Sequence, residues 1–375
     1  AEHRALFFGR KGEIGTILER LRTDPFVLVV ADSGIGKSSL CRAGVLPHVN
    51  EGALGGGRTW TVRSMVPGKR PLAALCGELA ALAKLSEDEL ANRLRKDPSD
   101  LGRLLHRQLA GDRGVVLFID QLEEIVTIGE TEEAFTVANA LGYLCARIPS
   151  VRMLMTVRSD FLARVAALPG LGDELARGLY LLRPLMPEKI KEAITGPAAT
   201  KGVHFESEEM VDALANETAR TDGGLPLLQF ALTELWEARR GDAITQQALE
   251  DIGGVSGALA RHADQVMLSL PEEQRKEARR ILMALVTVEG TRARRSDDEL
   301  VRTPEARPAL DALVRARLLV ARDTGEGVSY EVAHEALLKG WAALRKWLDE
   351  HRESRAARQR LEAATTEWLR LGKSR

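Results

Sequence analysis

A glycine-rich loop near the N-terminus combines residue types that can bind phosphate. It reads Ala31-Asp32-Ser33-Gly34-Ile35-Gly36-Lys37-Ser38-Ser39 and follows the apolar run Phe26 to Ala31. Gly34 and Gly36 let the backbone curl so that successive N–H groups point inward, and a helix starting near Lys37 adds its positive N-terminal end. Lys37 can reach the β- and γ-phosphates, and the Ser38 hydroxyl can bind Mg²⁺. The loop therefore predicts a site for a nucleoside triphosphate.

The first position of the loop departs from the strict pattern, because Ala31 replaces glycine. Alanine is the smallest replacement, so we expect only a tighter turn between strand and loop. An ordinary glycine-rich turn is the alternative, but the strand before it and the helix after it argue for phosphate binding. The residues expected to contact the nucleotide are Ser33, Gly34, Ile35, Gly36, Lys37, Ser38 and Ser39.

An acidic cluster follows a second apolar run, Val115 to Ile119, and reads Asp120-Gln121-Leu122-Glu123-Glu124. A buried strand that ends in Asp is where a P-loop protein supplies the carboxylate linked to magnesium, so Ser38 and Asp120 are the predicted metal residues. Glu123 or Glu124 would orient or deprotonate the attacking water. A solvated helix start favoured by the helix dipole is the alternative.

A hydroxyl and a guanidinium end a third apolar run, Val151 to Val157: Thr156 lies within it and Arg158 follows it. A strand end beside the γ-phosphate is a natural place for groups that sense or stabilise phosphate charge. Arg158 is therefore a predicted catalytic residue together with Lys37, although a surface arginine after a strand is common.

Short apolar runs that alternate with helical patterns must position these residues. The runs are Phe26 to Ala31, Trp60 to Ser64, Val115 to Ile119, Val151 to Val157 and Leu179 to Leu182, with helical patterns from about Lys37 and near Leu72 to Leu82. Fully apolar strands separated by helices indicate a parallel sheet covered on both faces. We expect a doubly wound α/β P-loop domain over residues 1–185.

The strand-like runs stop at Pro187, and helical spacing of apolar residues predicts an all-α domain over 186–270. Residues 271–350 are expected to form helices and a hairpin of Leu318 to Ala321 with Val328 to Ala333, which together make a winged helix-turn-helix domain. A long charged helix from Glu335 to about Leu371 would close the chain, with residues 351–375 as a helical linker.

Composition narrows the functional class. The formal net charge of the 375 residues is -1, which argues against a surface built throughout for nucleic acid. The three cysteines are scattered, which fits a reducing cytoplasm and suggests no disulfide framework or zinc site. No apolar run approaches the roughly 20 residues of a membrane-spanning helix, and the chain reads as a piece of something longer.

Several motifs, taken in order, resemble the STAND class of P-loop NTPases, and more narrowly the bacterial novel STAND group related to NACHT and AP-ATPase switches. Besides the loop and the acidic cluster, they are Phe8-Gly9-Arg10, Leu40-Cys41-Arg42-Ala43-Gly44-Val45-Leu46-Pro47, Thr156-Val157-Arg158-Ser159-Asp160-Phe161, Gly223-Gly224-Leu225-Pro226-Leu227-Leu228-Gln229 and Val332-Ala333-His334-Glu335-Ala336-Leu337. The resemblance covers nearly the whole chain.

The resemblance implies further nucleotide contacts. Gly224 and Pro226 match the GxP element of a helical lid whose proline packs on the base, and Arg10 matches a motif near the adenine. His334 matches the winged-helix histidine that reaches the ADP β-phosphate in related switches. Read without the family, a proline after two glycines signals a helix start, and a lone histidine after a strand is more often structural. Gln121 departs from animal relatives, which have glycine there.

The function implied is a nucleotide-driven switch that hydrolyses ATP slowly. It would be closed with ADP and open with ATP and Mg²⁺, then self-associate and activate an N-terminal effector in response to a C-terminal sensor, in bacterial signalling or antiviral defence. The residues do not separate ATP from GTP.

Two other functions compete with the switch. A DNA-binding ATPase or transcription regulator would use the winged helix, but residues 272–375 carry 22 Lys and Arg against 18 Asp and Glu, a small excess. The expected recognition helix, Glu305 to Arg317, mixes basic with acidic and apolar residues. A metabolic kinase would need an acceptor site, and the sequence suggests none.

Overall fold

The computed structural model describes residues 4–109, 111–127, 129–145, 148–221, 224–287, 290–316, 318–323, 328–333 and 336–350. The chain divides into two compact units, Ala1–His204 and Phe205–Arg375. The domain boundaries expected at 185/186, 270/271 and 350/351 stay predictions. Among the described residues, no helix is both long and apolar enough to cross a membrane.

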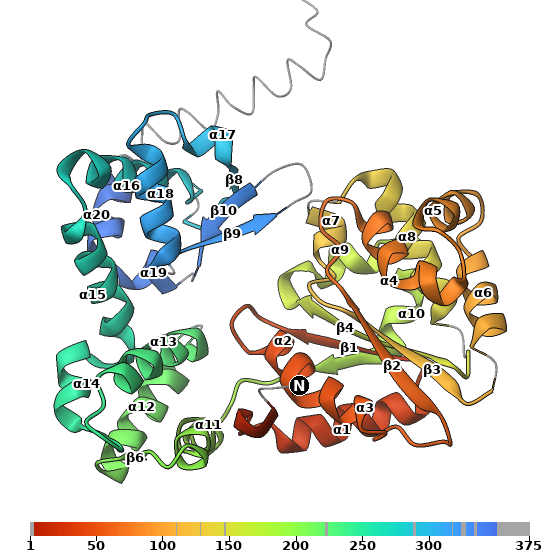
Figure 1. Ribbon diagram of the computed structural model, residues 1–375, viewed down its shortest axis with the longest axis horizontal. Helices are drawn as coiled ribbons and strands as arrows, with labels where there is room; N and C mark the ends of the chain where they lie inside the picture. The colour runs from red at the N-terminus through yellow and green to blue at the C-terminus, as the bar shows by residue number, and fades with distance from the viewer. Residues whose placement is uncertain are drawn as a thin grey trace, which may run out of the picture. The chain divides into compact units, whose positions relative to one another are not determined.

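A five-stranded parallel sheet forms the centre of the first unit (Figure 1). Its strands are β1 (Phe26–Ala31), β2 (Thr59–Met65), β3 (Arg113–Ile119), β4 (Val151–Arg158) and β5 (Leu179–Leu181), in the order β2-β3-β4-β1-β5. All neighbouring pairs are parallel, which confirms the expected parallel α/β core. Because β4 lies between β1 and β3, the carboxyl ends of these three strands meet at one edge.

The register of the strands fixes which residues meet there. Ala31 of β1 pairs with Arg158 of β4, and Ile119 of β3 pairs with Met155. The residue that follows Ile119 is therefore beside Thr156. Each of the three strands is buried along nearly its whole length, as expected for strands covered on both faces.

Successive side chains of a strand point to opposite faces of the sheet, so each strand offers apolar residues to both faces. Helices cover both of these faces. On one face, α1 (Lys11–Thr23) and α3 (Leu46–Asn50) pack against residues such as Val29 and Phe118. On the other, α4 (Pro71–Ala83), α5 (Glu87–Lys96), α6 (Asp100–Gln108), α8 (Thr131–Leu144) and α10 (Leu171–Gly178) pack against residues such as Leu28 and Leu117. The remaining helical elements are η1 (Arg4–Leu6), α7 (Glu124–Thr127), η3 (Ser159–Phe161), α9 (Leu162–Ala166) and α11 (Pro187–Thr200).

The helix expected from about Lys37 is not a regular α-helix. Its first turn is α2 (Lys37–Ser39), the residues Leu40–Val45 form a wider π-helical turn (η2), and α3 continues to Asn50. A methyl group at Gly44 would lie 2.8 Å from the Ile14 side chain, so glycine allows a close approach to α1 without moving that side chain. Widened turns of this kind are frequent at functional sites.

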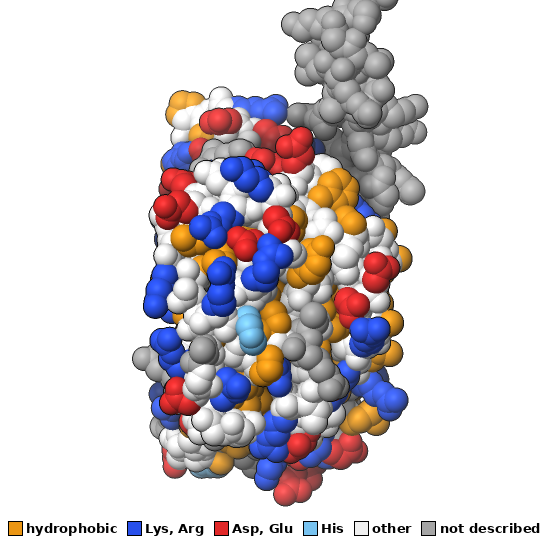
Figure 2. Space-filling view, turned by 90° about the vertical axis from the view of Figure 1, so that its right-hand side faces the viewer, with side chains coloured by type: hydrophobic (Ala, Val, Ile, Leu, Met, Phe, Trp, Pro, Cys, Tyr) orange, Lys and Arg blue, Asp and Glu red, His pale blue; other side chains and the backbone are white. Residues whose placement is uncertain are grey.

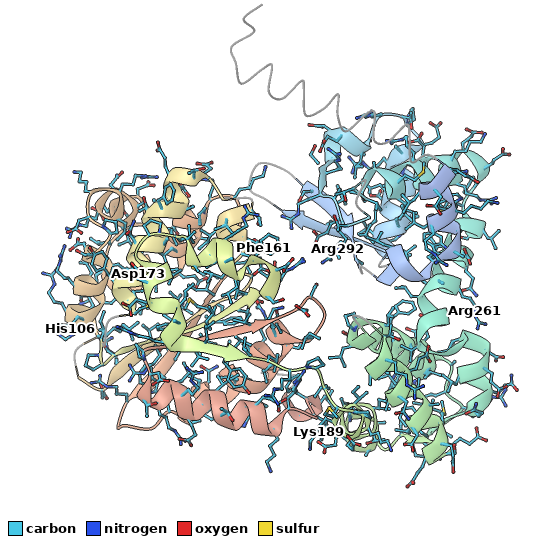
Figure 3. All side chains as sticks on the ribbon, turned by 180° about the vertical axis from the view of Figure 1, so that it is seen from behind. His106, Phe161, Asp173, Lys189, Arg261 and Arg292 are labelled. Atoms are coloured by element: carbon cyan, nitrogen blue, oxygen red, sulfur yellow. The ribbon has the colours of Figure 1, made fainter. Side chains whose placement is uncertain are left out.

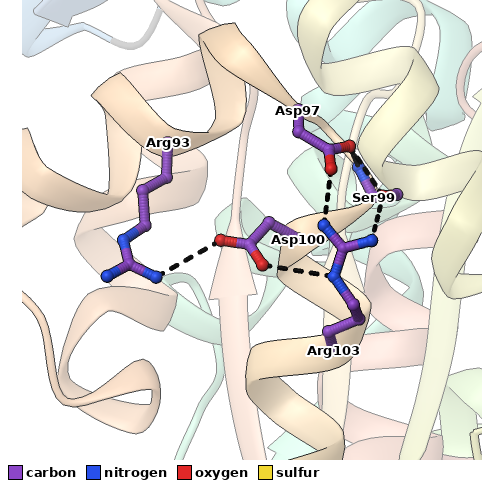
Figure 4. A network of polar contacts seen from close by, with 5 residues as sticks. All are labelled: Arg93, Asp97, Ser99, Asp100 and Arg103. Carbon is purple, nitrogen blue, oxygen red and sulfur yellow. Dashed lines mark hydrogen bonds and ion pairs between the residues drawn. The ribbon is translucent and has the colours of Figure 1, made fainter.

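An ion network ties α5 to α6 at the surface (Figure 4). Arg103 pairs with both Asp97 and Asp100, Arg93 pairs with Asp100, and the Ser99 hydroxyl donates to Asp97. Hydrogen bonds from Ser99 and Arg103 lower the pKa of Asp97 to about 2. Figure 2 shows acidic and basic side chains interspersed on this side of the unit. Exposed pairs stabilise a fold only weakly, so we expect this network to add little to the stability of the unit.

In the second unit, the first helices are α12 (Glu208–Arg220), α13 (Gly224–Glu237), α14 (Gln246–Ile252) and α15 (Gly254–Ser269). The expectation of an all-α segment was wrong in one detail: β6 (His204–Phe205) pairs with β7 (Ala243–Ile244). Glu206 extends this ladder, because its N–H donates to the Ile244 carbonyl and its carboxylate accepts from the Gln246 N–H.

The rest of the second unit combines helices with an antiparallel sheet of order β8-β10-β9. Its elements are α16 (Glu272–Ala284), β8 (Arg295–Ser296), α17 (Asp297–Leu300), α18 (Ala306–Arg315), β9 (Leu319–Asp323), β10 (Val328–Val332), α19 (Ala336–Gly340) and α20 (Ala342–Glu350). The strands β9 and β10 form the expected hairpin, whereas β8 was not expected. The long final helix is interrupted at Trp341, which is buried and donates to Asp264. Residues 351–375 lie outside the described residues.

Candidate functional site

The phosphate-binding loop leaves the end of β1 in a curled backbone. Gly34 and Gly36 have φ of +84° and +92°, in the left-handed region that favours glycine. Ala31 is instead the last residue of β1, paired with Arg158, and is not among the residues with positive φ. The alanine at the first position therefore sits in ordinary strand backbone and does not disturb the loop.

Lys37 lies folded over this loop. Its ammonium donates to the carbonyls of Ala31, at 2.7 Å, and Asp32, at 2.8 Å. Burial lowers the pKa of Lys37, while the nearby Glu123 raises it by a smaller amount. A polyanion in the loop could take over these hydrogen bonds, because a charged acceptor binds an ammonium more strongly than a carbonyl does.

Asp120 collects hydrogen bonds from two neighbouring elements. Its side chain is buried, and its Oδ1 accepts from the Ser38 hydroxyl at 2.8 Å and from the Thr156 hydroxyl at 2.6 Å. The Thr156 hydroxyl in turn accepts from the N–H of Gln121 at 2.9 Å. The loop, β3 and β4 thus meet at one carboxylate, as the strand order requires.

This arrangement fits a magnesium ion bound together with phosphate. Adjacent ligands of octahedral Mg²⁺, each at about 2.0–2.1 Å, lie about 2.9 Å apart. The Ser38 and Asp120 oxygens lie 2.8 Å apart, an ordinary hydrogen-bond distance at which both oxygens could also reach one ion. The described residues contain no group of three or more His, Cys, Asp or Glu side chains that could hold a metal by themselves. The remaining ligands would have to be phosphate oxygens and water, as is usual for this ion.

The two glutamates that follow Asp120 differ in their surroundings, although the sequence did not distinguish them. The Glu123 carboxylate is buried and accepts from the N–H of Arg158 at 3.2 Å, and burial raises its pKa. The Glu124 carboxylate accepts from the N–H of Gly68, in the loop after β2, at 3.1 Å. The first therefore lies near Lys37 and the end of β4, whereas the second supports a neighbouring loop.

The Arg158 side chain turns toward the residues that follow β4. Its guanidinium donates two hydrogen bonds to Asp160, at 3.0 and 2.7 Å, and lies 5.2 Å from the centroid of the Phe161 ring. Phe161 is labelled in Figure 3. The neighbouring Ser159 hydroxyl donates to the Asp32 carboxylate of the phosphate-binding loop. The end of β4 is therefore tied to the loop directly.

Arg10 is buried and bonded entirely within the protein. Its guanidinium donates to the carbonyl of Ile35 at 3.1 Å, to the carbonyl of Arg183 at 2.8 Å, and to Glu13 at 2.7 Å. It thus joins the tip of the loop to the segment that follows β5. A contact between Arg10 and the base stays a prediction.

The remaining predicted residues belong to the second unit. Gly224 and Pro226 lie in the first turn of α13, where a methyl group on Gly224 would approach the Thr218 carbonyl to 2.2 Å. The glycine is therefore required by local packing, and the proline suits a first turn. Their contact with a nucleotide stays a prediction. His334 lies outside the described residues.

One residue of this site, Arg42, was not predicted from the sequence. Its Nε donates to the second oxygen of Asp120, Oδ2, at 3.0 Å, and its guanidinium lies 5.3 Å from the centroid of the Phe118 ring. A spacing signal was available, since Arg42 follows Ser38 by four residues and residues so spaced share one helix face.

The comparison with protein families decides which family this site belongs to. A family model described as Novel STAND NTPase 1 matches residues 1–375. The chain belongs to the Novel STAND NTPase 1 family. The resemblance drawn from the motifs is thereby confirmed, and membership of this family supports nucleotide binding and hydrolysis by the P-loop unit.

Solved structures share the fold of this Novel STAND NTPase. The ORC1 protein of Aeropyrum pernix, in complex with DNA, is 17% identical with a TM-score of 0.51 and covers 94% of each chain. The ORC2 protein of the same organism, in ADPNP-ADP complexes, is 14% identical with a TM-score of 0.51, over 93% of this chain and 95% of its own. At such identities the likeness shows the fold alone. The comparison with curated proteins finds no match.

Proposed function

We propose that this chain is an ATP/ADP switch that hydrolyses ATP slowly. One observation carries the proposal: a single buried carboxylate, Asp120, accepts hydrogen bonds from the phosphate-binding loop and from β4. Such a carboxylate beside the hydroxyl of a P-loop serine is placed to hold Mg²⁺ against the β- and γ-phosphates. Ser33 to Ser39 would supply the amides that surround the phosphates.

Glu123 is the general base of this proposal. Its raised pKa makes it a stronger base than an ordinary carboxylate, and its contact with the Arg158 N–H places it beside the end of β4. Slow hydrolysis is supported by the Arg158 side chain, whose bidentate bond to Asp160 would have to break before the guanidinium could stabilise phosphate charge.

The second unit would convert the bound nucleotide into a change of conformation. We assign residues 186–270, which contain α11 to α15, to a helical lid, and residues 271–350, which contain α16 to α20 and the three-stranded sheet, to a winged helix. In the closed ADP form, Gly224, Pro226 and His334 would contact the nucleotide. The γ-phosphate needs only to bind the open form better than the closed one, after which self-association would activate an attached effector.

DNA binding through the winged helix is the alternative. The ORC1 protein of similar fold was solved in complex with DNA. In this chain, however, α18 buries Leu310 and Leu313, and Arg307 pairs with Asp297. One basic residue of this helix is thus bonded within its own chain, which favours the switch.

Two measurements on the purified chain test the switch. Nucleotide released by denaturation should be ADP, and calorimetry should show binding of both ADP and ATP. If the protein retains no nucleotide and binds none, the switch is excluded. If it instead binds duplex DNA tightly, with affinity falling steeply as salt rises, the alternative is favoured.

A further inference from the structure

Arg42 donates a hydrogen bond to the Asp120 oxygen that accepts none from the Ser38 and Thr156 hydroxyls. Ser38 and Thr156 both donate to Oδ1, whereas Arg42 donates to Oδ2 at 3.0 Å. The two partners differ in burial, since the Asp120 side chain is 4% exposed and that of Arg42 is 51% exposed. A buried carboxylate is thus paired with a cation that reaches it from the solvent side.

The helix that follows the phosphate-binding loop makes this pairing possible. The Ser38 hydroxyl donates to Oδ1 of Asp120, and Arg42, in the π-helical turn Leu40–Val45, donates to Oδ2. The Phe118 ring, in β3, lies under the guanidinium and restricts where it can go. One short segment therefore supplies both a hydroxyl ligand and a positive charge to the same carboxylate.

We propose that Arg42 is a resident counter-ion that neutralises Asp120 when no divalent cation is bound, and so makes nucleotide binding only weakly dependent on Mg²⁺. The inference rests on the proposed nucleotide site. It concerns a residue outside the set that binds the phosphates, and it adds a regulatory property that hydrolysis does not require.

Electrostatics gives the sign of the effect under both conditions. Without a divalent cation, an unpaired Asp120 would repel the phosphates, and Arg42 cancels that repulsion. With Mg²⁺, the Arg42 guanidinium repels the added charge and competes for Oδ2, which reduces the gain in affinity. Both effects reduce the difference in nucleotide affinity between the Mg²⁺-bound and Mg²⁺-free conditions. Removing Arg42 must therefore increase that difference.

The experiment measures the dissociation constant of ADP by calorimetry, in excess Mg²⁺ and in excess EDTA, and compares the two values as a ratio. For the wild-type chain we expect the EDTA value to exceed the Mg²⁺ value by about tenfold or less. Arg42→Gln should raise that ratio by about tenfold more, because it removes the charge and keeps a polar side chain. Arg42→Lys should stay near the wild-type ratio.

A matched control and a second background separate this effect from other roles. Arg177 is 77% exposed and pairs with Glu174 on α10, so Arg177→Gln should leave the ratio unchanged. In an Asp120→Asn background, Arg42→Gln should weaken binding in EDTA much less, because the exposed guanidinium is no longer held in place by a charged partner. A direct contact between Arg42 and phosphate would instead persist in that background and would overturn the proposal.

The remaining outcomes are equally decisive. An unchanged ratio in folded Arg42→Gln overturns the counter-ion role while leaving the nucleotide site intact. A wild-type ratio above about a hundredfold overturns it without any variant, which covers the case of a variant that fails to fold. Absence of ADP binding by the wild-type chain in both conditions would overturn the proposed function, and this inference with it.

Discussion

The hydroxyl of Thr156 donates to Asp120 at 2.6 Å and accepts from the N–H of Gln121 at 2.9 Å. One side chain of β4 therefore holds both the carboxylate at the end of β3 and the turn that follows it. The strand inserted between β1 and β3 contributes directly to the geometry of the site.

Thr156→Val should lower the free energy of unfolding. It leaves the Gln121 N–H without its acceptor and removes a donor from the buried Asp120, at a cost of about 1–3 kcal/mol. Urea unfolding measures the change. Thr156→Ser keeps the hydroxyl and is the matched control, so a loss in Thr156→Val no larger than that in Thr156→Ser would show that the two hydrogen bonds of Thr156 contribute little to stability.

Lys37→Ala should abolish ATP and ADP binding in calorimetry. The ammonium is the one side-chain cation of the loop, and it is held by two loop carbonyls that a polyphosphate would replace. Lys96→Ala, at an exposed position of α5, is the control and should bind as the wild type does. Retention of full affinity in Lys37→Ala would remove this lysine from the site.

Hydrolysis should fall as the pH drops toward the raised pKa of Glu123. The base must be deprotonated, and burial raises its pKa from the ordinary 4.5, so the acidic limb should lie above the range of an ordinary carboxylate. Steady-state phosphate release against pH measures this. Glu123→Gln should still bind ATP but not hydrolyse it.

Glu124→Gln is the control for this experiment. Its amide oxygen can still accept from the Gly68 N–H, so hydrolysis should continue with the same pH profile. Loss of hydrolysis in this variant, with normal hydrolysis in Glu123→Gln, would reverse the assignment of the two glutamates.

Asp160→Asn should accelerate hydrolysis. It removes the charge that holds the Arg158 guanidinium, so that this group becomes available to the phosphates. We expect an increase of about threefold to tenfold in the turnover number, because a surface ion pair is worth roughly 1 kcal/mol. An unchanged or lower rate, with ATP affinity intact, would show that Arg158 is not limited by this pair.

Gln121 has a backbone conformation that favours glycine. Its φ is +57°, in the left-handed region that a side chain disfavours. Gln121→Gly should change the free energy of unfolding by no more than about 0.5 kcal/mol, since relief of strain offsets the greater freedom of the unfolded chain. Gln121→Val should cost about 1–3 kcal/mol, measured by urea unfolding. Equal stability of the two variants would contradict this account.

Apolar runs predicted the sheet well, because strands such as Phe26–Ala31 are buried on both faces and need no partner to be recognised. The curled backbone of the phosphate-binding loop was also predicted, because the spacing of its glycines indicates where the chain can adopt positive φ. The distinction between Glu123 and Glu124 was not available, because it depends on a contact with Gly68, a residue distant in the sequence. β8 was not predicted, because its two residues, Arg295–Ser296, are too few to show an alternation of apolar and polar side chains.

Arg10 gives the loop a connection to the rest of the chain, because one guanidinium binds the carbonyls of both Ile35 and Arg183. A ligand that shifts the backbone at Ile35 must strain or break a bond that also fixes the path of the chain beyond β5. Thermodynamic reciprocity then requires the converse, so a pull on that outgoing segment would change how tightly such a ligand binds.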